Sequence, residues 1–117
     1  MRICGMVFVV ALACAPGVGL AETYLCKGVD PVWKLTMDNT SAEFDLRGKI
    51  GKFRVELTTV AKGRDAPSAR SLVGDFDTAI VILNDHMCED GISTSVSILT
   101  QDDTAAILLA GCCVLGN

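Results

Sequence analysis

The densest group of metal-binding residue types lies in the segment Asp85–Asp90, where His86, Met87 and Cys88 stand in succession. Soft sulfur together with imidazole is a donor set that suits copper or zinc. A structural zinc site, however, normally takes four ligands at fixed spacings such as Cys-x-x-Cys, and this spacing occurs nowhere in the sequence. We therefore predict no metal and no other cofactor, and keep as the alternative a small-ligand or metal carrier of the envelope that uses the barrel interior or the loop His86–Cys88.

The residue types needed for catalysis do not form a complete set. His86 is the only histidine, so any Ser-His-Asp or Cys-His arrangement would depend on it, and no Gly-x-Ser-x-Gly nucleophile motif is present. The acids of Asp75–Asp77 and Asp102–Asp103 could in principle perform acid–base chemistry. Asp102–Asp103 fits a hairpin turn, however, where Asp bonds to the backbone, and Asp75–Asp77 brackets a phenylalanine at the start of a strand. The sequence therefore predicts that the protein is not an enzyme.

The first 21 residues have the zones of a secretory signal peptide. Arg2 is their only charge, residues 3–20 are apolar or small, and Gly19–Ala21 provides small residues at the −3 and −1 positions of a cleavage site. The stretch is too short, and too broken by Pro and Gly, to be a retained spanning helix. We predict residues 1–21 to be a cleaved signal peptide and residues 22–117 to be a single secreted or periplasmic β domain without a transmembrane span.

A second processing route would give a different location. The segment Ala11–Cys14 faintly resembles a bacterial lipobox, in which the cysteine carries the lipid, although Ala11 stands where a lipobox normally has leucine. Anchoring through Cys14 is therefore the alternative to a free exported domain.

Four cysteines remain after cleavage, namely Cys26, Cys88, Cys112 and Cys113. An even number of cysteines in a short exported chain is typical of a disulfide framework. A bridge between Cys112 and Cys113 is the least favoured, because neighbouring cysteines strain the bridge geometry. We expect Cys26 and Cys88 each to bond one of the C-terminal pair, and both arrangements of that pairing stay open.

Alternation of apolar and polar residues predicts the strands that would position these residues. The alternating segments are Trp33–Met37, Ala42–Leu46, Phe53–Val60 and Ile92–Ile98. The run Phe76–Leu83 is almost wholly apolar, which is typical of a strand covered on both sides.

Residues 61–70 are predicted as a surface loop, Ser71–Val73 as a short strand or the approach to one, and Ala105–Ala110 as the last strand. No sustained helical period occurs. The predicted fold is all-β, a small disulfide-bridged antiparallel meander of six to seven strands closing as a barrel or sandwich.

Charge is distributed unevenly along the domain. Every basic residue after the signal lies between Lys27 and Arg70, and from Ser71 onward the charged residues are all acidic. An acidic half repels phosphate and argues against nucleic acid as a partner, whereas it permits a cationic protein. Trp33, the only tryptophan, is either an anchor for a partner or a core residue, and its alternation with Leu35 and Met37 favours the core.

Three segments resemble signatures of a family of uncharacterised bacterial envelope proteins. Cys26–Leu35 reads Cys-Lys-Gly-Val-Asp-Pro-Val-Trp-Lys-Leu and is similar to the family's opening Cys-x-Gly-x-Glu-Pro-Phe-Trp-x-Leu. Cys88–Ser93 and Gly111–Cys113 are similar to its later Cys-x-Asp-Gly-Met-Ser and Gly-Cys-Cys. This chain departs from the family at Asp30, at Val32 and at the position of the signature methionine. The resemblance implies a periplasmic or lipid-anchored β domain, and it supplies no catalytic residues.

These observations favour an exported, non-enzymatic domain that binds a protein or envelope partner. A lysozyme-inhibitor-like module is the concrete version, because an acidic face complements a strongly basic enzyme. The candidate binding residues are Asp30, Trp33, His86 and Asp90.

Overall fold

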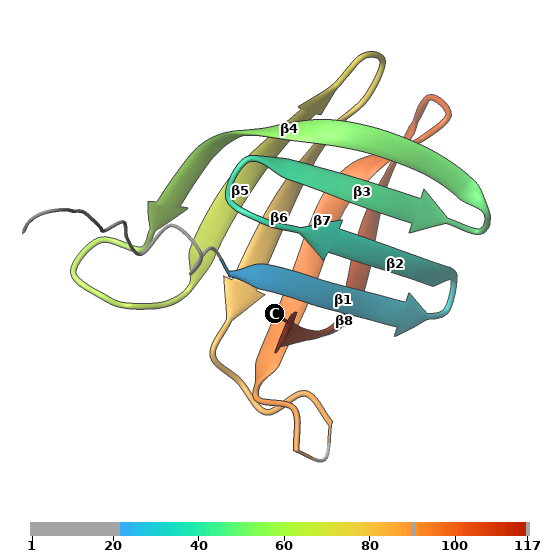
Figure 1. Ribbon diagram of the computed structural model, residues 1–117. Helices are drawn as coiled ribbons and strands as arrows, with labels where there is room; N and C mark the ends of the chain where they lie inside the picture. Colours follow the sequence, from blue (N-terminus) through green and yellow to red (C-terminus); the bar gives the residue numbers. More distant parts are fainter. Residues whose placement is uncertain (1–21, 90, 117) are drawn as a thin grey trace, which may run out of the picture.

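Eight antiparallel strands follow one another along the chain and close into a barrel, with the last strand pairing back onto the first (Figure 1). The computed structural model describes residues 22–89 and 91–116, so the predicted signal peptide, Cys14 and Asp90 lie outside the described residues. The strands are β1 Thr23–Val29, β2 Val32–Met37, β3 Ser41–Leu46, β4 Lys49–Val60, β5 Ser68–Gly74, β6 Thr78–Asn84, β7 Thr94–Asp102 and β8 Ala105–Gly116. The predicted antiparallel meander is confirmed, and it closes as a barrel. None of the described segments is a helix that could cross a membrane.

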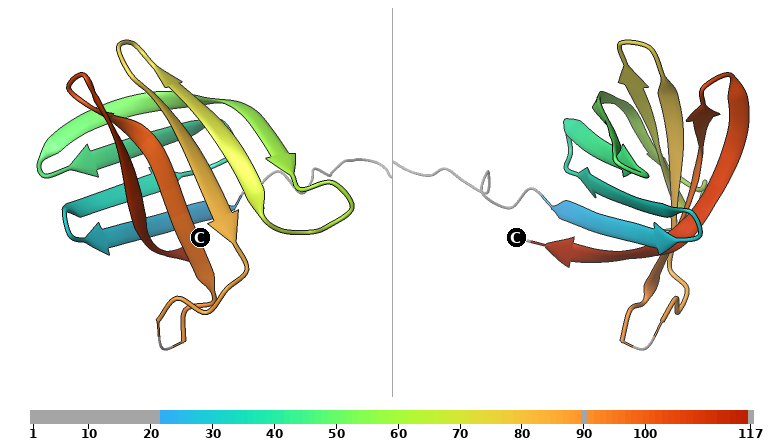
Figure 2. Two further views of the ribbon diagram at one scale, coloured as in Figure 1. Left: turned by 180° about the vertical axis from the view of Figure 1, so that it is seen from behind. Right: turned by 90° about the vertical axis from the view of Figure 1, so that its right-hand side faces the viewer.

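The connections alternate between two ends of the barrel, because each strand runs opposite to its neighbours. The short turns β1–β2, β3–β4, β5–β6 and β7–β8 lie at one end, which we call the mouth. The longer β4–β5 and β6–β7 loops lie at the other end, and Figure 2 shows the β6–β7 loop on the opposite side from the β5–β6 and β7–β8 turns.

The strand count exceeds the prediction because β1 gives only a weak signal in the sequence. Its inward positions are Tyr24, Cys26 and Gly28, and of these only Cys26 is fully buried. A glycine contributes no apolar side chain to the alternation, so a periodicity argument does not detect this strand.

The prediction that Phe76–Leu83 forms a strand covered on both sides is wrong. The strand β6 begins at Thr78, Phe76 lies in the turn before it, and Ile80 on the outer face of β6 is exposed. No second layer covers the outer wall here, because one closed sheet encloses the whole core of the described residues. The long apolar run therefore reflects an apolar outer surface rather than a doubly covered strand.

The predicted surface loop 61–70 is also too long. Its last residues belong to β5, and Arg70 points into the barrel with only 7% of its surface exposed. The guanidinium lies 5.0 Å from the centre of the Tyr24 ring, a cation–π arrangement, and Nη1 donates to the Asp38 carbonyl oxygen over 3.5 Å. The sequence did not indicate an inward position for Arg70, because its neighbours are polar and a charged residue is rarely buried in a protein interior.

The seam, where β1 and β8 close the barrel, is packed around Trp33. A Cβ at Gly28 would lie 2.7 Å from Trp33 Cε2, and a Cβ at Gly111 would lie 2.7 Å from Trp33 Cζ2. Such distances are well inside van der Waals contact, so the indole occupies space that both glycines leave free. Trp33 is 2% exposed. The interpretation of Trp33 as a core residue, rather than as an anchor for a partner, is therefore confirmed.

Two disulfides hold the seam and the loop beside it. Cys26 of β1 bonds Cys113 of β8, which lies directly opposite in the register, and Cys88 of the β6–β7 loop bonds Cys112. The prediction that Cys26 and Cys88 each bond one of the C-terminal pair is confirmed, and the structure decides between the two arrangements. All four sulfurs are thereby removed from the possible metal ligands.

Candidate functional site at the barrel mouth

The candidate binding residues from the sequence do not come together in the fold. Trp33 lies in the core, Asp30 is exposed in the β1–β2 turn at the mouth, and His86 is exposed in the β6–β7 loop at the other end. Asp90 lies outside the described residues. These residues therefore do not form one site.

Within the described residues, the surroundings of His86 do not assemble the three ligands that a metal ion needs. The side chain lines an open hollow of about 440 Å³ together with Arg64, Asp65 and Asp85. Its sulfur neighbour Cys88 is in a disulfide. Among residues 22–89 and 91–116, no three His, Cys, Asp or Glu side chains lie close enough to hold an ion.

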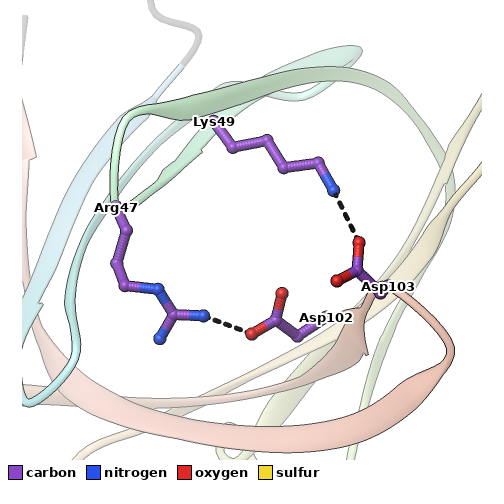
Figure 3. Close-up of polar contacts among 4 residues, drawn as sticks. All are labelled: Arg47, Lys49, Asp102 and Asp103. Carbon is purple, nitrogen blue, oxygen red and sulfur yellow. Dashed lines mark hydrogen bonds and ion pairs between the residues drawn. The ribbon is translucent and has the colours of Figure 1, made fainter.

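Two ion pairs cross the mouth between hairpins far apart in the sequence. Arg47 of the β3–β4 turn pairs with Asp102 at the end of β7, and Lys49 Nζ lies 3.5 Å from Asp103 Oδ1 (Figure 3). Figure 3 shows both cations on one rim of the opening and both carboxylates on the other. At the rim, the β3–β4 and β7–β8 hairpins are thus joined by two ion pairs.

The β3–β4 turn is shaped to present Arg47. Arg47 and Gly48 both have positive φ, 53° and 91°, as a two-residue type I′ hairpin requires. The carboxylate of Asp45 accepts a hydrogen bond from the Gly48 N–H over 2.8 Å, which holds the turn. Glycine at the second position satisfies the left-handed backbone without strain, and the arginine side chain is directed to the rim.

The β5–β6 turn carries the most exposed aromatic side chain of the described residues. The Gly74 N–H donates to the Asp77 carbonyl oxygen over 2.8 Å, closing a tight turn with Asp75 and Phe76 at its tip. Phe76 is 97% exposed, so its ring gains almost nothing from the fold. Below it lies a hollow of about 390 Å³ between the start of β4 and the turn, lined by Lys49–Phe53 and Gly74–Asp77.

A second, smaller hollow of about 60 Å³ continues from the first across the opening. It shares Lys49–Gly51, Phe53 and Asp77 with the first hollow, and its far wall is Thr100–Asp102. Thr100 is buried and its hydroxyl donates to the Thr78 carbonyl oxygen over 2.8 Å, which fixes that wall. The mouth is therefore a hollowed surface, whereas the barrel interior is filled by the core side chains.

The charge balance at the mouth is negative. Residues 30, 47–49, 75–77 and 102–103 of its four turns carry two cations, both in the ion pairs above, and five carboxylates, and Lys52 on the wall of the hollow adds a third cation. Asp30, Asp75 and Asp77 have no ion-pair partner within the part of the chain that the structure describes. Asp75 and Asp77 flank the exposed phenyl ring in its turn, and Asp30 lies in the β1–β2 turn of the same end, so this end has the chemistry to contact a positively charged surface.

A hollow on the side wall of the barrel has a smaller charge imbalance. It measures about 580 Å³ and lies over the outer faces of β2, β3 and β4. Lys34 stands opposite Asp45 in the register, and Glu43 stands opposite Lys52. Opposite charges on neighbouring strands neutralise one another, so this wall offers less attraction to a charged partner than the mouth.

Asp38, in the β2–β3 turn at the other end, has a clear structural role. The backbone N–H groups of Thr40 and Ser41 donate to its carboxylate over 2.8 and 2.9 Å. These hydrogen bonds favour the ionised form and lower the pKa of Asp38 below its usual value. The carboxylate is a turn-forming group rather than part of a site.

The sequence singled out Asp30 and the other carboxylates of the mouth, but it did not indicate the roles of Phe76, Arg47 and Lys49. Phe76 was assigned to a strand, and Arg47 and Lys49 were not singled out. The acidic half predicted from Ser71 onward does contribute Asp75, Asp77, Asp102 and Asp103 to this end. The only local signal for the mouth is the turn chemistry of Asp45–Gly48 and of Asp102–Asp103.

The fold and the site define a small disulfide-bridged antiparallel β-barrel with a hollowed, acidic mouth. Comparisons of the chain with protein-family models, with curated proteins and with solved structures gave no match.

Proposed function

We propose that the protein is an exported, non-enzymatic binding domain whose barrel mouth docks a cationic protein. One observation carries the proposal, the exposed Phe76 ring between Asp75 and Asp77 above a hollow. A tight turn does not require an aromatic residue at its tip. Burial of such a ring against a partner contributes about 2 kcal/mol, and aromatic anchors of this kind carry much of the energy of protein interfaces.

The charges at the mouth support a basic partner. Asp30, Asp75 and Asp77 lie at the mouth, and no further cation lies on its turns besides Arg47 and Lys49. Carboxylates at the rim of an interface raise the association rate with a positively charged protein and disfavour acidic competitors. The phenyl ring thus contributes to the affinity for the partner, and the acidic rim contributes to the association rate.

The signal-peptide pattern and the two disulfides support a place outside the cytoplasm, in the periplasm or beyond it. The resemblance to envelope proteins supports the same location. A strongly basic enzyme that attacks the cell wall, such as lysozyme, is the partner whose charge and location fit best. A lysozyme-inhibitor-like role is therefore the concrete form of the proposal.

Binding of lysozyme to the purified exported protein tests the proposal by calorimetry and by inhibition of lysis. We expect micromolar or tighter binding, which Phe76→Ala weakens by at least about tenfold, equivalent to about 1.4 kcal/mol. Leu57→Ala is the matched control, because Leu57 is 70% exposed on β4 beyond the mouth. Both variants should unfold at the wild-type denaturant concentration. Absence of binding at micromolar levels, or equal losses in both variants, would overturn the proposal.

A further inference from the structure

The start of β4 has a neighbouring strand on one side only. β4 pairs with β3 from Lys49 onward, but its pairing with β5 begins only at Phe53, which lies opposite Gly74. The chain turns away after Gly74 and returns as β6. Residues Lys49–Lys52 therefore form a free strand edge at the mouth, which we call the β4 edge.

The register shows which backbone groups of the β4 edge face the open side. The Val55 N–H donates to the Thr40 carbonyl oxygen over 2.9 Å, so the backbone groups of Val55 face β3. Backbone groups alternate in direction along a strand. Those of Lys49, Gly51 and Phe53 therefore face β3 as well, and those of Ile50 and Lys52 face away from it.

No strand lies opposite Ile50 or Lys52 on the open side, and none of the turn and loop backbone hydrogen bonds of the described residues involves these two residues. An edge of this kind is a template on which another extended chain can pair. The flanking lysines and the short length limit such pairing, as is usual for strand edges that must not aggregate.

Space for an added chain lies directly beside the edge. The hollow of about 390 Å³ is bounded on one side by Lys49–Phe53 and on the other by Gly74–Asp77. A Cβ at Gly74 would lie 3.0 Å from the Lys52 carbonyl oxygen, so the edge closes at that point and opens toward Ile50. Ile50 and Phe76 are both exposed beside it. The hollow thus combines unpaired backbone groups with apolar side chains and the carboxylates of Asp75 and Asp77.

We propose that the β4 edge accepts an extended segment of the partner protein as an added strand. Backbone hydrogen bonds to Ile50 and Lys52 hold the segment, its apolar side chains contact Ile50 and Phe76, and its basic side chains face the carboxylates of Asp75 and Asp77. The inference rests on the proposed function only in taking the ligand to be a basic polypeptide. It adds that recognition runs through the main chain and selects a segment with alternating apolar and basic residues.

A titration of the isotope-labelled exported protein with a capped Val-Lys-Val-Lys-Val-Lys peptide tests the inference by NMR. The matched control peptide carries N-methyl groups on every residue, which remove the backbone donors along both of its edges but keep charge and side chains. We expect saturable shifts at the Ile50 and Lys52 amides and slowing of their hydrogen exchange by at least about tenfold, with the unmodified peptide only. Equal effects of the two peptides, or no shift at Ile50 and Lys52, would overturn the inference.

Two variants of the protein test whether the peptide is recognised through the main chain of the β4 edge. Lys52→Pro removes an N–H that faces the open side and leaves the β3 ladder its bonds, whereas Lys52→Ala removes only the side chain. We expect the proline variant to lose peptide affinity by at least about tenfold and the alanine variant to bind within about twofold of wild type. Equal affinities in the two variants contradict main-chain recognition. The N-methyl comparison stands even where the proline variant does not fold.

The two proposals fail in distinguishable ways. Lysozyme binding that depends on Phe76, with no peptide effect at Ile50 and Lys52, overturns the strand site and leaves the proposed function intact. Peptide pairing at the β4 edge without any binding of lysozyme keeps the strand site and excludes lysozyme as the partner.

Discussion

The seam and the mouth of the barrel hold the same sheet closed by different means. At the seam, one disulfide joins β1 to β8 and the Trp33 indole fills the space above Gly28 and Gly111. Trp33, Cys26 and Cys113 are buried there, so a change of one atom in this packing must displace its neighbours. The seam therefore has one task, to keep the sheet closed.

At the mouth, exposed ion pairs join hairpins that share no hydrogen-bonded strand pair, and a phenyl ring projects into solvent. Exposed ion pairs contribute little to stability, so these residues can change without loss of the fold. The difference teaches that the residues with the most conspicuous types, the cysteines, the glycines and the tryptophan, maintain the architecture. The surface suited to a partner is made by ordinary turn residues.

The largest expected effect follows from opening the seam. Replacing Cys26 and Cys113 by serine removes a bridge that spans 87 positions, and replacing Cys88 and Cys112 removes one that spans 24. The loop-entropy relation predicts losses of about 4.5 and about 3.5 kcal/mol respectively in the free energy of unfolding. Urea denaturation of both double variants measures the difference.

Intact mass without reductant is the control, since it shows that both bridges are formed in the exported protein and one in each variant. A larger loss for the Cys88–Cys112 pair would contradict this ranking. It would mean that the β6–β7 loop, rather than the β1–β8 seam, limits the stability of the barrel.

A medium effect is expected from filling the space that Trp33 occupies. A Cβ at Gly28 would lie 2.7 Å from the indole and 2.8 Å from the Ala110 carbonyl oxygen. Gly28→Ala should therefore cost about 1–3 kcal/mol by overpacking. In a Trp33→Phe background the smaller ring leaves room, so the same alanine should cost at least about 1 kcal/mol less. Thermal or urea unfolding of the four proteins measures this coupling, and purely additive losses would show that the indole does not set the requirement for glycine.

The disulfide framework and the core position of Trp33 were predictable from the sequence, whereas strand β1 and the arrangement of the mouth were not. Cysteine count and spacing limited the bridges to two arrangements, and alternation placed Trp33 in the core. Arg47 and Asp102 are 55 positions apart, and their meeting depends on how the closed sheet brings two hairpins to the same rim. Local periodicity carries no information on such a meeting. The apolar run that contains Phe76 gave the opposite of the observed exposure, because period and composition do not show where a turn starts.

The smallest effect on stability is expected from variants at the mouth. These variants should change the association rate with the partner while leaving the free energy of unfolding almost unchanged. Arg47→Gln and Lys49→Gln each remove an exposed ion pair, so each should cost less than about 1 kcal/mol, and the loss should vanish at high salt. Each variant also frees a carboxylate at the mouth, so lysozyme should associate faster at low salt.

Arg64→Gln is the control, because it changes the net charge equally in the β4–β5 loop at the other end. Stopped-flow association at two salt concentrations measures the effect. If all three variants accelerate binding alike, the whole-molecule charge steers the partner. If the two mouth variants accelerate association more than Arg64→Gln does, the partner approaches through the mouth. The ion pairs then neutralise two carboxylates that would otherwise attract the basic partner.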